Sequence, residues 1–387
     1  MRKLLILCFI LSAAALCGQR FYSTWQWEKL EKAPAQLEVD TAWGEDILPG
    51  FESRFVNQGK AFDGPCRSTI VRKLCPQRSR RAFLYIHGFN DYFFQSEMGQ
   101  QMVDSGINFY AVDLRRYGRS RLPWQYPFNV RDMKEYFADI DSALTQIRRD
   151  GNTDITLGGH STGGLTVIFY ATERGARSGV NRVVTNSPFL EWNFNTFTRN
   201  VAVPVVGAFS HLAPNAKIKQ GACDGYAYSL LREYHGRWNY NTDWKMIYSP
   251  PVTWSWINAI NRAQSRVMSA GEHNIVVPVL VMHSSRRITG CGWTPEFQTG
   301  DCVLNPFDIE ARARRLGRGG RVHVCTIDSG IHDLILSEPR PARAAYDSIF
   351  KFIRVESGEW RVESGERRGK GENFVKKRFD GGEVSVL

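Results

Sequence analysis

Short runs of apolar residues alternate with segments of helical periodicity over most of the chain. The apolar runs lie at residues 83–88, 108–113, 154–157, 182–188, 275–283 and 321–327. Continuous runs of this kind are typical of strands that are buried on both faces of a parallel sheet. Residues 131–149 instead place apolar side chains at helical spacing, which predicts an amphipathic helix. The pattern predicts an α/β fold with a mostly parallel, doubly wound sheet covered by helices.

The turn after the third of these runs contains the motif G-x-S-x-G. Residues 159–163 read Gly-His-Ser-Thr-Gly, between the predicted strand at 154–157 and a helix-compatible run at 165–173. A strand, a tight turn and a helix around such a serine are the setting of a nucleophile elbow. We therefore predict that Ser161 is a nucleophile, with the backbone N–H of Thr162 facing a developing oxyanion.

Two further turns follow predicted strands. Residues 87–91 read His-Gly-Phe-Asn-Asp, and residues 113–120 begin with Asp-Leu-Arg and end with Gly-Arg-Ser. Together with the Gly-His-Ser-Thr-Gly-Gly segment at 159–164, their order and spacing resemble the α/β-hydrolase superfamily, in its serine aminopeptidase and monoacylglycerol-lipase-like (lysophospholipase) branch. The resemblance covers roughly residues 80–190 and a C-terminal histidine segment. It implies the α/β-hydrolase fold with an inserted helical lid and serine-hydrolase chemistry.

A serine nucleophile needs a histidine base. In this superfamily the chain order is serine, acid, histidine, and the resemblance places the histidine after the last strand. His332 follows the apolar run at 321–327 and fits that place. Three other histidines are weaker candidates, because the pattern puts them at a strand end, inside a strand or at the end of the lid segment: His283, His323 and His273.

The acid of the triad is harder to assign. The resemblance places it soon after the strand that ends at His283, but Ser-Ser-Arg-Arg follows that strand. In the resembled family the acid is followed by two apolar residues and a turn. Residues 301–306, Asp-Cys-Val-Leu-Asn-Pro, resemble that segment, which makes Asp301 the candidate. We therefore expect residues 286–300 to be an insertion that displaces the acid in sequence but not in space. Asp308 and Glu296 are the alternatives.

These assignments define an acyl-transfer site. Ser161 would attack an acyl carbonyl, His332 would accept its proton, and Asp301 would hold the imidazole tautomer. The backbone N–H groups of Phe89 and Thr162 would form the oxyanion hole. This chemistry requires no cofactor and no metal. His87, His160 and Asp113 are interpreted as structural residues.

The landmarks divide the chain into five parts. Residues 1–18 read as a signal peptide, residues 19–188 and 274–355 as the two parts of the hydrolase core, residues 189–273 as the lid, and residues 356–387 as a disordered charged tail. The lid segment is rich in aromatic residues, which favours an apolar roof over the site. The hairpin expected at the start of the core pairs residues 51–57 with residues 67–74.

The N-terminus and the cysteines concern export. Two basic residues, an apolar stretch and small residues near position 14 predict an exported protein, either secreted or periplasmic; a lipoprotein acylated at Cys17 and an uncleaved membrane anchor are the alternatives. Six cysteines remain after the signal segment. Cys66 and Cys75 flank a predicted strand about 30 Å long, so we do not expect them to pair. Cys291 and Cys302 bracket a loop, and we expect them to form a disulfide.

Charge and the lid bear on the substrate. The net charge of +11 comes from scattered arginines without a nucleic-acid-binding motif, so we expect a basic surface with, at most, weak attraction to anionic membranes. The aromatic lid and the resemblance favour carboxylic esters of lipid-like monoacyl molecules. An aminopeptidase, which would need carboxylates around the substrate amine, and a non-catalytic binding protein of the same fold remain alternatives.

Overall fold

The computed structural model describes residues 30–221, 223–317 and 320–356 of the chain. The predicted signal peptide at 1–18 and residues 357–387 of the predicted tail lie outside the described residues. Within the described ranges, no helix has the length and hydropathy needed to cross a membrane.

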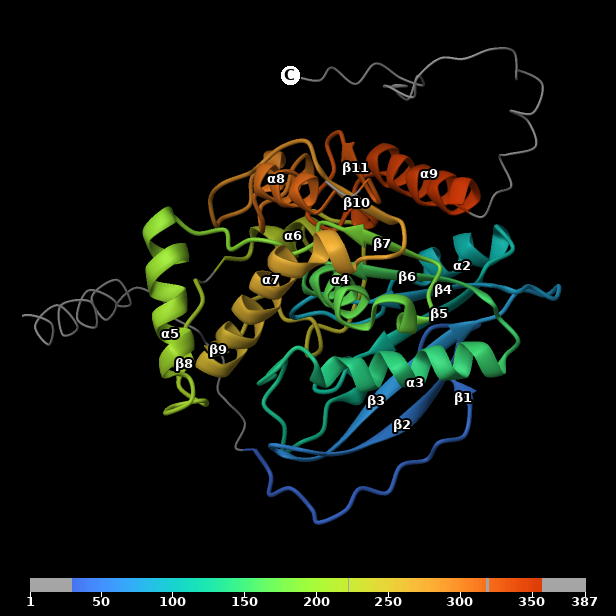
Figure 1. Ribbon diagram of the computed structural model, residues 1–387, viewed down its shortest axis with the longest axis horizontal. Coiled ribbons are helices and arrows are strands. Elements are labelled where there is room, and N and C mark those ends of the chain that lie inside the picture. Colours follow the sequence, from blue (N-terminus) through green and yellow to red (C-terminus); the bar gives the residue numbers. More distant parts are fainter. Residues whose placement is uncertain (1–29, 222, 318–319, 357–387) are drawn as a thin grey trace, which may run out of the picture.

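A nine-stranded sheet in the order β1-β2-β3-β5-β4-β6-β7-β10-β11 forms the centre of the molecule (Figure 1). The strands from β5 to β11 in this order run parallel, and β1, β2 and β3 are antiparallel to their neighbours. Their bounds are Gly44–Glu45, Glu52–Ala61, Gly64–Lys73, Arg81–Ile86 (β4), Asn108–Asp113 (β5), Asp154–His160 (β6), Arg182–Asn186 (β7), Val279–Ser284 (β10) and Val322–Ile327 (β11). The predicted α/β fold with a mostly parallel sheet is confirmed.

Helices cover both faces of this sheet. One hydrophobic cluster lies under α3 (Glu135–Arg149), α4 (Thr162–Arg174), α7 (Trp254–Asn274) and α8 (Pro306–Leu316). A second cluster lies on the other face, under α2 (Ser96–Asp104) and α9 (Pro339–Glu356). The strands between these two layers are buried on both sides, which explains why they are continuously apolar in sequence.

Three local predictions can be compared with the structure. The hairpin pairs Glu52 with Arg72 and Asn57 with Arg67, as expected. Its second strand keeps Cys66 and Cys75 apart, and both are free thiols. The run predicted to begin at 275 enters the sheet only at Val279, because Pro278 has no N–H to donate to the ladder.

The segment between β7 and β10 contains several short elements and one long helix. These are η3 (Thr198–Ala202), α5 (Val203–Phe209), β8 (Lys217–Ile218), α6 (Gly225–Leu230), β9 (Val252–Thr253) and α7. The elements η3, α5, β8 and β9 lie at one side of the molecule in Figure 1. Helix α7 packs against α4 and contributes Ile260, Ala263 and Val267 to the main core, so this part of the expected lid also supports the sheet.

Candidate active site

Ser161 lies in a tight turn between the end of β6 and the start of α4. Its backbone has φ 54° and ψ −116°, a strained conformation for a residue with a side chain. The turn closes only because its neighbours are glycines: a Cβ on Gly159 would lie 2.4 Å from the carbonyl oxygen of Gly163, and a Cβ on Gly163 would lie 2.3 Å from that of His87. The local sequence therefore forces Ser161 outward at the carboxyl edge of the sheet.

His332 meets this serine from the loop after β11. Its Nε2 lies 3.0 Å from Ser161 Oγ, and its Nδ1 lies 2.8 Å from Asp301 Oδ2. Because the carboxylate can only accept, Nδ1–H donates to Asp301 and Nε2 accepts from the serine hydroxyl. Ser161 is 8% exposed, His332 2% and Asp301 0%, so the three groups are almost fully shielded from bulk water.

Asp301 is held by its own surroundings. Its Oδ1 accepts hydrogen bonds from the backbone N–H groups of Val303 at 2.8 Å and Leu304 at 2.7 Å, which leaves Oδ2 for the histidine. The carboxylate therefore stands in a fixed orientation before any substrate binds. This is the arrangement that keeps an imidazole in the tautomer needed to accept a proton.

The other acids and histidines considered from the sequence lie elsewhere. Asp308 lies in the first turn of α8 and accepts a hydrogen bond from the side-chain amide of the N-cap residue Asn305 at 3.0 Å. Glu296 lies in the short helix η4 (Pro295–Gln298). His283 donates from Nδ1 to the carbonyl oxygen of Ser284 at 2.8 Å, and burial lowers its pKa. His323 contacts Phe352, and His273 is in the last turn of α7.

The two expected oxyanion donors flank the nucleophile. Phe89 follows Gly88, whose added Cβ would lie 3.2 Å from Ser161 Cβ, so this loop passes directly over the serine. Thr162 is the first residue of α4, where backbone N–H groups have no partner inside the helix. Within the described part of the chain, neither N–H donates a hydrogen bond to a protein atom.

Structural roles fit the remaining motif residues. His87 donates from Nδ1 to Gly88 O at 2.8 Å and accepts from the N–H of Leu114 at 3.1 Å, which ties together the turns after β4 and β5. Asp113 accepts from the backbone N–H groups of Phe93 and Arg119 and pairs with the Arg119 guanidinium at 2.9 Å. Both residues shape the loop that carries Phe89.

A buried polar cluster adjoins the triad. Lys245 donates to Asp91 at 2.9 Å, and ligand atoms of Asp91, His160 and Asp333 lie within 4.8 Å of one another. Burial acts to raise the pKa of Asp91, but Lys245 and the neighbouring histidines outweigh it and hold the pKa below its usual value. Burial lowers the pKa of His160, so this imidazole is neutral at neutral pH. The Lys245 ammonium already occupies the place beside Asp91 that a cation would take.

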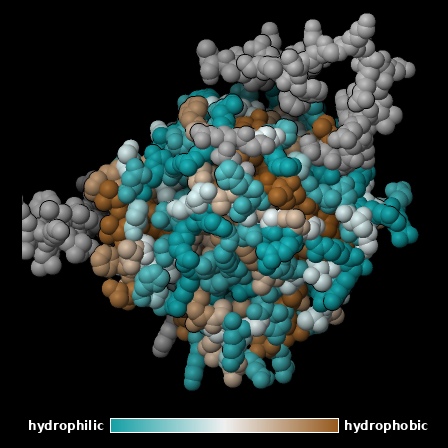
Figure 2. Space-filling view, in the orientation of Figure 1, coloured by the Kyte–Doolittle hydropathy of each residue, from teal (hydrophilic) through white to brown (hydrophobic). Residues whose placement is uncertain are grey.

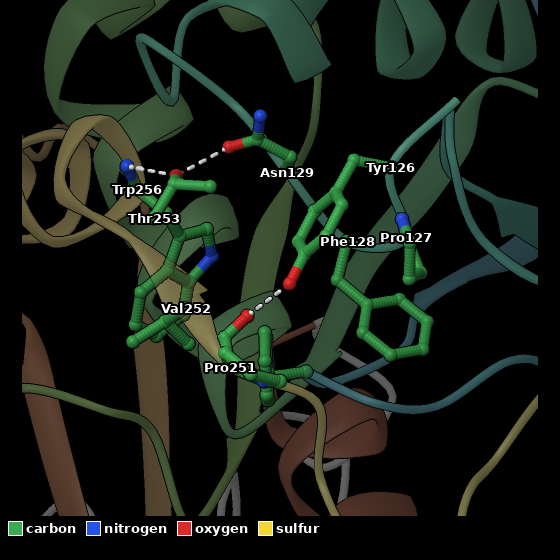
Figure 3. A pocket seen from close by; sticks show the side chains of 9 residues that line it. Tyr126, Pro127, Phe128, Asn129, Pro251, Val252, Thr253 and Trp256 are labelled. Carbon is green, nitrogen blue, oxygen red and sulfur yellow. Dashed lines mark hydrogen bonds between the residues drawn. The ribbon is translucent and has the colours of Figure 1, made fainter. Parts of the chain in front are cut away.

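An aromatic pocket lies on the other side of the oxyanion loop. Phe89 contacts Phe128 and Trp256 at ring-centroid distances of 5.3 and 4.7 Å. All three residues line a small cavity. Figure 3 shows Phe128 and Trp256 around it together with Tyr126 and Pro251, and the Tyr126 hydroxyl donates to the Pro251 carbonyl at 2.8 Å. The cavity is small: about 10 Å³ of it is open to the centre of a water-sized sphere, which is room for about one water molecule. An apolar group next to an oxyanion at Phe89 would lie against this wall.

Comparison with known proteins agrees with this arrangement. The sequence model of the family described as serine aminopeptidase, S33, matches residues 77–287, which is more than half of the chain. The chain belongs to the serine aminopeptidase family of α/β hydrolases. The matched region contains Ser161 and ends before Asp301 and His332. No curated protein sequence matches the chain significantly.

Solved structures show the same fold. A soluble variant of monoglyceride lipase from Saccharomyces cerevisiae has a TM-score of 0.58 and 16% identity, with 84% of this chain and 98% of that one covered. A monoacylglycerol lipase from Paleococcus ferrophilus has a TM-score of 0.53 and 18% identity, covering 74% and 99%. A carboxyl esterase from Bacillus coagulans has a TM-score of 0.57 and 13% identity, covering 78% and 98%. The α/β-hydrolase fold of this family member is thereby confirmed.

The disulfide in this hydrolase differs from the expected one. Cys223 pairs with Cys291, and Cys302 is a free thiol, so the expected Cys291–Cys302 pair is wrong. Cys302 follows Asp301 into the interior, where burial raises the pKa of its thiol, whereas Cys291 lies exposed near the far end of the insertion and faces the lid. Spacing in the sequence could not reveal this, because the lid segment that supplies Cys223 is distant along the chain.

Lys245 and Tyr226 are the residues near the site that sequence reasoning missed. Lys245 is buried against Asp91, and the Tyr226 ring contacts the His332 ring at 5.7 Å. Neither belongs to a motif. The signal that could have been noticed in the sequence is a lysine, Lys245, within an aromatic-rich segment.

Proposed function

We propose that this protein is a serine hydrolase that cleaves carboxylic esters of lipid-like monoacyl substrates. One observation carries the proposal: a single buried imidazole bridges Ser161 and Asp301, at 3.0 and 2.8 Å. This is the geometry that activates a serine hydroxyl and stabilises the imidazolium that forms when His332 takes its proton.

The reaction divides into two halves. Ser161 Oγ attacks the acyl carbonyl, the oxygen becomes negatively charged, and the N–H groups of Phe89 and Thr162 stabilise it. His332 then gives its proton to the leaving alcohol oxygen, and the acyl group remains on Ser161. A water molecule, deprotonated by the same imidazole, attacks the acyl-enzyme and releases the carboxylic acid. The triad geometry supports each of these proton transfers without further groups.

The surroundings favour an acyl ester over an aminoacyl amide. The aromatic side chains of Phe89, Phe128 and Trp256 offer an apolar surface beside the oxyanion loop, against which the start of an acyl chain would pack. The carboxylates near the site are already paired: Asp91 with Lys245 at 2.9 Å, and Asp333 with the side-chain amide of Asn186 at 2.6 Å. A substrate ammonium would have to displace these partners. The contact of Asp301 with His332 also supports catalysis over non-catalytic binding.

A substrate panel tests this choice. The purified protein is assayed on monoacylglycerols and lysophospholipids, and in parallel on aminoacyl amides and short peptides with free N-termini. The proposal expects turnover of the monoacyl esters and at least 100-fold lower kcat/KM on the amides. Faster amide cleavage would transfer the assignment to aminopeptidase, and no turnover of either class would favour a binding protein.

We further propose weak association with anionic membrane surfaces through the lid. Apolar side chains are exposed at intervals of three or four residues from residue 194 to residue 212, along η3 and α5 and in the turns that flank them, including Phe197 at 59% and Leu212 at 81%. Figure 2 shows hydrophobic side chains gathered over α5. Residues 192–223 contain no acid, while Arg199, Lys217 and Lys219 are basic. An apolar face with basic neighbours is suited to the headgroup region of an anionic bilayer.

Vesicle binding tests the surface. Vesicles of phosphatidylcholine with added phosphatidylglycerol should retain the protein, and salt should weaken the binding. Phe197→Asp and Leu212→Asp should reduce binding, whereas Ile47→Asp, at a residue 61% exposed outside the lid, should not. Equal binding of all four proteins would contradict the proposal.

Export remains our proposal for localisation, supported by the disulfide, which persists in oxidising compartments.

A further inference from the structure

One segment of the lid is bonded to the loop that carries the oxyanion donor Phe89. Residues 90–92 directly follow Phe89, and each of them bonds to the lid segment 241–246. The bonds run from Asn90 Nδ2 to Met246 O at 2.8 Å, from Lys245 Nζ to Asp91 Oδ1 at 2.9 Å, and from Asn241 N to Tyr92 Oη at 2.8 Å. Residues 241–246 contain no helix or strand, so their buried backbone groups need partners from elsewhere. The oxyanion loop supplies some of these partners.

The side chain of Asn90 makes a two-point contact with the backbone of Met246. Its Nδ2 donates to the Met246 carbonyl, and its Oδ1 accepts from the Met246 N–H, both at 2.8 Å. Asn90 is 9% exposed and Met246 5%, so water hardly competes for these bonds. An aspartate could accept from the N–H but, when ionised, could not donate to the carbonyl. The contact therefore uses both halves of the amide.

The peptide that carries the Phe89 N–H is held from both sides. Its carbonyl oxygen, on Gly88, accepts from His87 Nδ1 at 2.8 Å. In a trans peptide the N–H points opposite to the carbonyl, so this bond also sets the direction of the Phe89 N–H. On the other side Asn90 has φ 49°, in the left-handed region that asparagine tolerates better than most residues. The Met246 anchor keeps the chain in this turn directly after Phe89.

We propose that Asn90 is a positioning residue for the oxyanion hole. By binding the Met246 backbone, it holds the Phe89 N–H at the place where negative charge forms on the substrate oxygen. This inference rests on the proposed ester hydrolysis. An oxyanion donor contributes fully only when it already stands about 2.7–3.1 Å from the charged oxygen. A loop released from the lid would spread the N–H over several orientations, so the lid segment belongs to the catalytic apparatus and does not only cover it.

Two substitutions separate the anchor from the backbone conformation. Asn90→Gly removes the side chain but adopts a positive φ readily, whereas Asn90→Ala removes the side chain and also disfavours that φ. Asn90→Gly should lower kcat on a monoacylglycerol by roughly 10- to 100-fold, which is less than the roughly 10²–10³-fold cost of losing a donor completely. KM should stay within about 2-fold, because the interaction forms only in the transition state. Asn90→Ala should lose at least as much.

A trifluoromethyl ketone with a fatty chain reports on the oxyanion hole directly. Ser161 Oγ adds to its carbonyl carbon, the carbonyl π electrons become the oxyanion, and the serine proton moves to His332 Nε2. The corresponding trifluoromethyl alcohol has the same chain but cannot form this adduct. Asn90→Gly should weaken inhibition by the ketone by about the factor by which it lowers kcat/KM, and should change inhibition by the alcohol by less than about 2-fold.

Gln220→Ala is the matched control. Gln220 also uses its side-chain amide to bond a backbone carbonyl of the lid, that of Pro250 at 2.8 Å, but this bond stays within the lid. The variant should keep the wild-type kcat and both inhibition constants. Circular dichroism at the assay temperature verifies that each variant is folded.

Three results would overturn the inference. Wild-type kcat in Asn90→Gly, even with a slow Asn90→Ala, would mean that the anchor does not hold the donor. Equal weakening of ketone and alcohol would mean that Asn90 maintains the site as a whole, and an equal loss in Gln220→Ala would mean that any lid bond has this effect. In all three cases the wild type still hydrolyses the ester and takes up a fluorophosphonate at Ser161. A wild type that does neither refutes the proposed function itself, so the two failures are distinguishable.

Discussion

The backbone N–H of Asp301 donates to the carbonyl oxygen of Arg286 at 2.8 Å. The N–H of Ile288 returns a bond of 2.8 Å to the carbonyl oxygen of Asp301, so the two segments pair as a short bridge just after β10. The residues between them form an excursion that leaves the sheet edge and comes back. Asp301 therefore reaches His332 from the end of β10, although 16 residues separate it from the last residue of that strand, Ser284.

Substituting this acid should impair catalysis specifically. Asp301→Asn should reduce kcat by roughly 10³–10⁴-fold, because an amide in place of the carboxylate favours the wrong imidazole tautomer. Asp308→Asn is the matched control, since that residue lies in the first turn of α8, where it accepts from Asn305, and the bond to His332 comes from Asp301. Steady-state kinetics on a monoacylglycerol measures both. A larger effect at Asp308 would move the acid there.

The disulfide should matter for the same acid. Cys223–Cys291 joins α6 to the excursion that ends at Asp301. Chain-entropy arguments for a sequence separation of 68 residues give about 4 kcal/mol of stability. We expect Cys223→Ser with Cys291→Ser, or reduction, to lower kcat through a less constrained Asp301, beyond what the loss of folded protein explains.

Cys325→Ser is the control for this experiment, because Cys325 is a free thiol on β11 beside Ser348. Intact-mass spectrometry of protein from its native compartment should show one disulfide. Reductant should lower kcat only in proteins that keep that bond. Full activity after complete reduction, verified by mass, would refute the functional role of the disulfide.

Much of this molecule follows from its sequence, for identifiable reasons. The buried strands and the glycine-flanked Ser161 are local features, because sheet burial and a tight turn each demand particular residues in a row. The hairpin of β2 and β3 could be anticipated for the same reason, whereas His332 was assigned from the resemblance and its place after the last strand. Asp301 was an inference from a resemblance plus an assumed excursion. The bridge to Arg286 that brings it back depends on backbone pairing, which leaves no clear trace in residue type.

Contacts between distant segments were not predictable. The partner of Cys291 comes from the lid, Lys245 reaches Asp91 across 154 positions of sequence, and Tyr226 meets His332 only after α6 docks on the excursion. Each of these three contacts depends on how a whole segment packs against the rest of the fold. The sequence signals aromatic richness in the lid but not which of its side chains turn toward the site.

The buried ion pair makes a prediction about stability. The side chains of Lys245 and Asp91 are 7% and 1% exposed, so Lys245→Met would leave a carboxylate buried without its main partner. We expect a loss of about 3–5 kcal/mol in the free energy of unfolding. The double variant Lys245→Met with Asp91→Asn should recover much of it, and Lys219→Met, at an exposed lysine, should stay within about 0.5 kcal/mol. Urea titration measures all three; a Lys245→Met protein as stable as wild type would contradict the assignment.

Acid should destabilise the fold through its buried histidines. Burial lowers the pKa of both His160 and His283 in the folded state. The unfolded chain therefore binds more protons below a pH of about 6.5, and stability is full above that pH and falls as the pH drops toward the folded-state values. Each histidine contributes a slope of at most about 1.4 kcal/mol per pH unit. Asp91, whose pKa is also lowered, adds to the loss only below its usual value of 3.8.

Unfolding curves between pH 7 and pH 5 check this dependence. His283→Gln should flatten the slope without affecting the triad, since among the described residues the His283 ring bonds to Ser284 and Thr326 and to no triad member. A variant with an unchanged slope, or a wild type that becomes more stable in this range, would show that the buried imidazoles do not govern the response.

Fluorophosphonate labelling tests the central claim most directly, because the probe reacts with a serine that a histidine has activated. The account predicts one adduct per chain on the wild type, located at Ser161 by peptide mass spectrometry. Ser161→Ala should keep the same circular dichroism, take up no probe and lose ester hydrolysis. Labelling at another residue, absence of labelling on folded wild type, or a Ser161→Ala protein with activity within tenfold of wild type would contradict the account.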